Sequence, residues 1–161
     1  MSPATRYIRT ETAISVAINA VLSALAFVLV FGLRGPVPVW GPGGLVLDGL
    51  PQGFMIALMS TLVPGVLTVR RLRRGALAPD ALRDGALAAR LPANLLLRAL
   101  VLALLTALGA MAILALAGFL VGAPGVVSWS LALCGKVLLG ALLAVLVTPF
   151  ALRAALATPL R

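Results

Sequence analysis

Lys136 is the residue whose chemistry conflicts most with its surroundings, because it follows Trp129 by seven positions inside a long apolar run. On a helix, seven residues place it about 10 Å deeper in a membrane than the tryptophan. An ionised side chain costs roughly 2.5–3.5 kcal/mol at the centre of a bilayer span. Three interpretations stay open: the stem snorkels to the outer interface, the ammonium pairs with Asp48, or it faces an inward ligand site.

A second group of polar residues follows the first apolar run at i+4 spacing: Glu11, Ser15, Asn19 and Ser23. On a helix, this spacing forms one slowly drifting stripe. Such a stripe could line a polar path, or it could let neighbouring helices approach closely and hydrogen bond. We favour packing, because the stripe stops about halfway along the run.

The chain lacks the residues that most catalytic and metal sites require. It has no histidine, which removes the commonest general base and the commonest transition-metal ligand. The single cysteine, Cys134, excludes an intrachain disulfide and is expected to pack as a small apolar residue. We therefore expect no enzymatic activity, no cofactor and no metal. Nor does a nucleic-acid-binding motif accompany the net charge of +9, so we expect no nucleic acid partner.

The composition explains how such a chain can fold. Hydrophobic residues make up 62% of the 161 positions and charged residues 11%, whereas a globular domain has roughly 45–50% and 25%. A soluble domain of this size cannot bury so much apolar surface, but a lipid bilayer can accept it. The sequence therefore predicts an all-α membrane protein with four transmembrane helices.

The apolar runs and the proline and glycine residues between them set the expected spans. A loop rich in glycine and proline follows the first span. Pro51 is expected to open the second span, and Pro64 to kink it. A short helix is expected inside the basic connector, over 79–90. The predicted spans are 13–33, 51–69, 94–121 and 129–152, with a cytoplasmic connector at 70–93.

The arginines indicate how the chain is oriented. Two lie in the N-terminal tail, seven between positions 70 and 98, and two in the C-terminal tail, whereas the loops on the other side carry Arg34 alone. Positive residues prefer the cytoplasmic side of a membrane. We therefore expect both termini in the cytoplasm of a bacterium, with the chain in its inner membrane and Arg98 reaching cytoplasmic headgroups.

The two halves of the chain share landmarks that predict a tandem duplication of a two-helix hairpin. Each half turns at glycine and proline followed by tryptophan, Trp40 or Trp129, and ends with proline and then arginine. This Pro-then-Arg ending resembles that of small, uncharacterised inner-membrane proteins of proteobacteria that are built from two-helix hairpins. The resemblance covers only the helix ends and implies no activity.

Two functional classes follow from these observations. The sparse polarity favours an accessory or structural subunit that packs in the lipid bilayer against other membrane protein subunits or copies of itself. The alternative is a small oligomeric transporter or channel assembled around the first-span stripe and Lys136.

Overall fold

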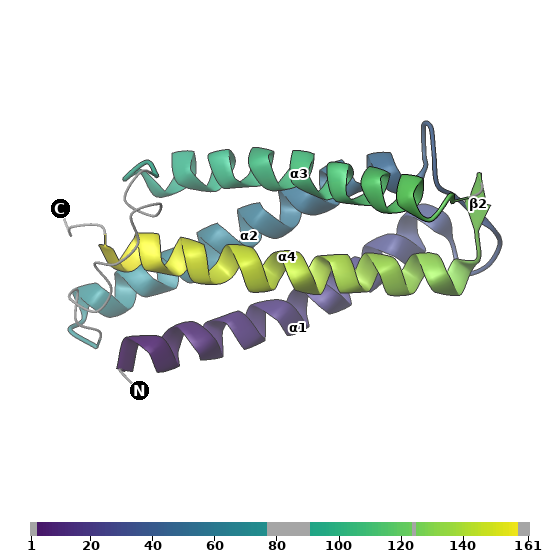
Figure 1. Cartoon of the computed structure of the whole chain (residues 1–161). Coiled ribbons are helices and arrows are strands. Elements are labelled where there is room, and N and C mark those ends of the chain that lie inside the picture. Colours follow the sequence, from purple (N-terminus) through teal and green to yellow (C-terminus); the bar gives the residue numbers. More distant parts are fainter. Residues whose placement is uncertain (1–2, 77–90, 124, 158–161) are drawn as a thin grey trace.

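The computed structural model describes residues 3–76, 91–123 and 125–157, and in them the chain forms a bundle of four helices, each running antiparallel to the helix before it (Figure 1). Each helix is long and apolar enough to span a membrane. α1 begins and α4 ends at one end of the bundle, which we call the arginine end. The loop 32–44 and the described residues between α3 and α4 lie at the other, which we call the hairpin end. In order, the elements are α1 (Pro3–Phe31), β1 (Val37–Pro38), α2 (Leu45–Arg73), α3 (Leu95–Leu120), β2 (Val126–Val127) and α4 (Trp129–Ala157).

The helices of one hairpin pack mainly against those of the other. The most extensive interfaces join α2 to α3, α1 to α4, and α2 to α4, whereas α1 barely touches α2 and α3 barely touches α4. Exchanging the two hairpins, so that α1 replaces α3 and α2 replaces α4, leaves this list of interfaces unchanged. The pattern of contacts therefore has an approximate twofold symmetry.

Short β-strands and two tryptophans repeat this symmetry at the hairpin end. The strands β1 and β2 pair antiparallel, Val37 opposite Val127. The Trp129 indole donates to the carbonyl of Gly32, just past α1, at 3.0 Å, and the Trp40 indole donates to Ala123, just past α3, at 3.4 Å. Each tryptophan thus binds the end of the first helix of the other hairpin.

Small residues allow α2 and α3 to approach closely. A Cβ atom added to Gly53 would lie 2.7 Å from the carbonyl oxygen of Thr106 and 2.9 Å from the Cα of Ala107. One turn earlier, a Cβ on Gly49 would meet the Leu114 side chain at 2.9 Å. Since these neighbours include main-chain atoms, this interface depends on glycine.

The helices exceed the predicted spans at several ends. The first helix already begins at Pro3 rather than near 13, and the fourth continues to Ala157. The second helix begins at Leu45 rather than at Pro51, so α2 takes in the last residues of the expected loop, whereas the glycine- and proline-rich part before Leu45 stays outside the helix. Interior proline removes one hydrogen bond without ending a helix, so Pro51 lies inside α2. The short helix expected over 79–90 lies outside the described residues.

Arg98 also departs from its expected position. Its side chain is 2% exposed and turns back toward the helix start, where Nε donates to Pro92 and Nη2 to Ala93, both at 3.1 Å. Asn94 caps the same turn by accepting from two backbone N–H groups. The guanidinium is therefore buried against carbonyls of its own chain, whereas it was expected to reach cytoplasmic headgroups.

Candidate functional site

An ion pair between α4 and α2 lies at the hairpin end. Lys136 Nζ donates to Asp48 Oδ2, and both side chains are almost fully buried. The ammonium also lies 5.5 Å from the centre of the Phe31 ring, a distance at which a cation is attracted by the ring face. Lys136 therefore pairs with Asp48 in the structure, which is the second of the three interpretations of this lysine.

Gln52, one turn after Asp48 on α2, connects this pair to α1. Its amide Nε2 donates to the Lys136 carbonyl at 2.9 Å and to Ser23 Oγ at 3.2 Å. Ser23 in turn lies against Gly140 of α4, where an added Cβ would overlap its hydroxyl. The amide therefore ties three helices together immediately beneath the ion pair.

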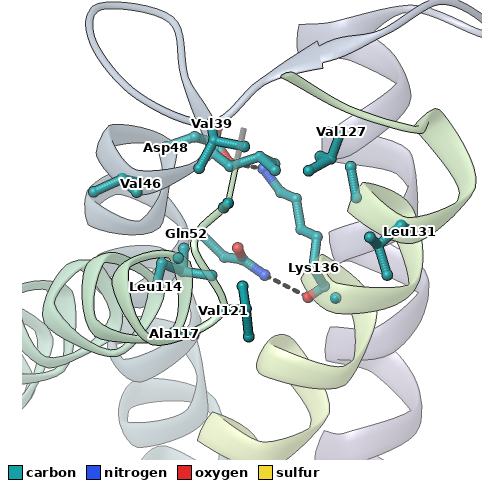
Figure 2. A pocket seen from close by; sticks show the side chains of 15 residues that line it. Val39, Val46, Asp48, Gln52, Leu114, Ala117, Val121, Val127, Leu131 and Lys136 are labelled. Atoms are coloured by element: carbon teal, nitrogen blue, oxygen red, sulfur yellow. Dashed lines mark hydrogen bonds and ion pairs between the residues drawn. The ribbon is translucent and has the colours of Figure 1, made fainter. Parts of the chain in front are cut away.

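A partly open cavity of about 220 Å³ adjoins these polar groups (Figure 2). Its walls come from the start of α2, the end of α3, the start of α4, β2 and the residue that follows β1. The Lys136 side chain extends from α4 along the cavity toward Asp48, with Gln52 below it (Figure 2). The other lining residues are apolar: Val39, Leu45, Val46, Leu114, Ala117, Gly118, Val121, Ala123, Val127, Leu131, Ala132 and Gly135.

A second polar cluster lies deeper in the bundle, where α1, α2 and α4 meet. Ser15 Oγ is 3.1 Å from Ser60 Oγ and accepts from Thr148 Oγ1 at 2.8 Å. Asn19 Nδ2 donates to the Ser15 carbonyl at 2.8 Å and to Ser60 Oγ at 3.2 Å. All four side chains are buried, so these hydrogen bonds satisfy polar groups that lipid could not.

Glu11, the first residue of the stripe, lies at the arginine end, where it contacts neither of the two polar clusters above but pairs with Arg71. Arg71 Nη1 donates to Glu11 Oε1 at 2.9 Å, and its guanidinium lies 4.9 Å from the centre of the Tyr7 ring. The Tyr7 hydroxyl is 2.9 Å from Thr68 Oγ1. Because the Arg71 side chain is 45% exposed, this ion pair is partly open to solvent or headgroups.

The structure therefore divides the predicted site residues between two places. Lys136, Asp48 and Ser23 meet at the hairpin end, whereas Ser15 and Asn19 belong to the central cluster. Three hydrogen-bond partners of these residues were not predicted: Gln52 and Ser60 of α2, and Thr148 of α4. A signal for them exists, because Asp48, Gln52, Ser60 and Thr68 follow the i+4 series of one helix face.

The arrangement offers binding chemistry through charge and hydrogen bonds. Within the described parts of the chain, no three histidine, cysteine, aspartate or glutamate residues lie close enough together to hold a metal ion. Cys134 is a free cysteine with an exposed side chain. Comparison with known proteins gives no matching family model, no matching curated protein and no matching solved structure.

Proposed function

We propose that the protein is an accessory or structural subunit of a membrane, without catalytic activity of its own. In this proposal it packs through its apolar outer surface against a larger membrane complex or against copies of itself. One observation carries the proposal: the polar stripe of α1 faces α2 and α4, where Ser15 and Asn19 are hydrogen bonded. A pore between copies would need those groups on an outer face, lining water.

The outer surface suits contact with lipid or with other helices. Many of its large apolar side chains are exposed, among them Leu29 at 85%, Phe119 at 78% and Leu138 at 69%. In a bilayer, apolar faces of this kind associate by close packing rather than by polar recognition. The outer surface therefore supports packing in a membrane and gives little support to a polar path between copies.

We also propose a location and a history for the chain. Its arginines gather at the end where α1 begins and α4 ends, which supports a bacterial inner membrane protein with both termini in the cytoplasm. The exchange symmetry of the helix contacts, together with the paired tryptophans, supports a tandem duplication of one hairpin.

The alternative, a small transporter or channel, would use the interior of one bundle. The polar residues that α2 carries from Asp48 to Thr68 support it, because they run along most of the helix. A path there would have to open the hydrogen bonds that now join Ser60 and Gln52 to other helices. We therefore give preference to the subunit.

Photo-crosslinking in native membranes tests the proposal. A photoreactive amino acid is placed at Leu29, Phe119 or Leu138 in turn, and the tagged protein is then extracted in mild detergent and sized. We expect a particle larger than the monomer and adducts concentrated at one of the three faces. A bare monomer with no adducts contradicts the proposal, and a discrete homo-oligomer that conducts ions in liposomes favours the alternative.

A further inference from the structure

The cavity at the hairpin end combines apolar walls with a charge pair whose formal charges cancel. Apart from Lys136, Asp48 and Gln52, the residues that line it are apolar. A ligand with a net charge would leave that charge unbalanced in an apolar site, at a high free-energy cost. The cavity is therefore suited to an uncharged ligand.

The polar groups retain hydrogen-bonding capacity beyond the contacts they make. An ammonium has three N–H donors, and among the described residues the hydrogen bond of Lys136 Nζ is the one to Asp48. The Gln52 amide uses its nitrogen for Ser23 and for the Lys136 carbonyl. A ligand oxygen that accepts from the ammonium would therefore add a bond without breaking any of these.

The position of the cavity indicates how such a ligand would arrive. It lies between α3 and α4, which barely touch, and its rim includes Leu131 and Val121, with exposed fractions of 63% and 77%. About 220 Å³ is smaller than the roughly 300–1,000 Å³ of sites that enclose whole ligands. A compact head would fill the cavity, while an attached chain would extend between the helices into lipid.

The geometry points to a binding site for an uncharged, lipid-soluble molecule that presents a carbonyl oxygen to Lys136 Nζ. Two kinds of molecule carry this chemistry: a ring with carbonyl groups and an apolar tail, and an acyl ester of an uncharged alcohol. The site stands apart from the proposed subunit role, because a structural subunit can bind such a molecule or lack it.

Tryptophan fluorescence provides the test, since both tryptophans, Trp40 and Trp129, lie at the hairpin end and the Trp40 ring contacts Gly118 in the cavity wall. The purified full chain in detergent is titrated with decyl-benzoquinone. We expect saturable quenching at one molecule per chain. Monodecanoylglycerol added as competitor separates the two kinds of ligand: displacement indicates that an ester carbonyl is also accepted, and no displacement assigns the site to the ring.

Matched glycine variants make the test specific. An added Cβ has open space at Gly135, which lines the cavity, and at Gly109, which does not. Gly135→Phe should weaken binding by about tenfold or more, whereas Gly109→Phe should leave it unchanged. Quenching that rises without saturation, or equal quenching in both variants, overturns the site. If plain decane displaces the quinone as effectively as the ester does, the carbonyl oxygen has no role in binding and this part of the proposal is overturned.

Discussion

At the scale of single residues, the bundle places its one lysine and Asp48 together near the hairpin end. Each charge alone would be expensive inside an apolar bundle, and the attraction between them repays part of that cost. The Phe31 ring and the Gln52 amide complete the surroundings of the pair. The pair joins α4 to α2 and so couples the two hairpins.

The first prediction concerns the loss of either partner. Lys136→Met or Asp48→Asn should each lower the free energy of unfolding by roughly 3 kcal/mol, because the remaining partner stays buried and uncompensated. The double variant should recover much of this loss. Unfolding by SDS, followed by circular dichroism, measures all three changes.

A second ion pair in the same chain serves as the control. Arg71 and Glu11 also join two helices, but the arginine side chain is about half exposed. Their replacement by Met and Gln should cost less than about 1 kcal/mol each. If Lys136→Met is instead neutral and the loss of Asp48 has no effect, the buried pair contributes nothing to stability.

The sequence alone was enough to single out Lys136, from its depth in an apolar run, and to suggest Asp48 as its partner. Lys136 is conspicuous in an apolar run, and Asp48 was the single acidic residue expected on its side. Gln52, Ser60 and Thr148 were not assigned to the site, because an uncharged polar side chain in a span has many potential partners. Which of them it meets depends on the rotation of each helix, and this is fixed only by packing.

At the scale of helices, hydropathy located all four helices but did not predict where several of them begin or end. Charged or polar residues at a helix end lower the hydropathy but do not stop the helix, as in α1 near Arg6 and Arg9. The glycine- and proline-rich stretch before Leu45 is not helical, as expected, but α2 begins at Leu45, so Pro51 lies within the helix rather than at its start. The two short strands were also missed, because two paired residues create no periodic pattern.

The second prediction concerns the glycine interface of α2 with α3. Gly53→Ala should destabilise the bundle by about 1–3 kcal/mol, because the new methyl group meets main-chain atoms of α3 that cannot rotate away. Gly109→Ala on α3 is the control, since its methyl group has open space. There the higher helix propensity of alanine should stabilise by up to about 1 kcal/mol. Equal effects in SDS unfolding would contradict the close interface.

At the scale of the whole molecule, one sequence shift relates the two hairpins at their turns. A shift of 89 positions moves Val37 onto Val126, Pro38 onto Val127 and Trp40 onto Trp129. The same shift maps the paired strands onto each other. The second helices depart from it, because α4 begins at its tryptophan whereas α2 begins five residues after Trp40. Lys136 and Asp48 occupy non-equivalent positions, so the ion pair breaks the symmetry.

The third prediction concerns the orientation of the bundle. Reporters fused after residue 161 or within 75–90 should report a cytoplasmic location, and reporters fused within 36–46 or 123–127 should report a periplasmic location. The reason is that positively charged segments are retained in the cytoplasm. Alkaline phosphatase and green fluorescent protein fusions measure the two sides. A single fusion on the opposite side contradicts the four-span arrangement with both termini inside.

The last prediction tests whether each hairpin behaves as a unit. If the chain is broken between residues 76 and 91 and the halves are co-expressed, they should reassemble, because the largest interfaces join one hairpin to the other. A tag on the first half should co-purify the second, and SDS unfolding should show one cooperative transition. The Gly53→Ala change in the first half should reduce recovery of the second, since Gly53 contacts α3, whereas Gly109→Ala in the second half should not. Halves that remain apart, or that each unfold independently, would show that the covalent link, and not the exchange of contacts between hairpins, holds the bundle together.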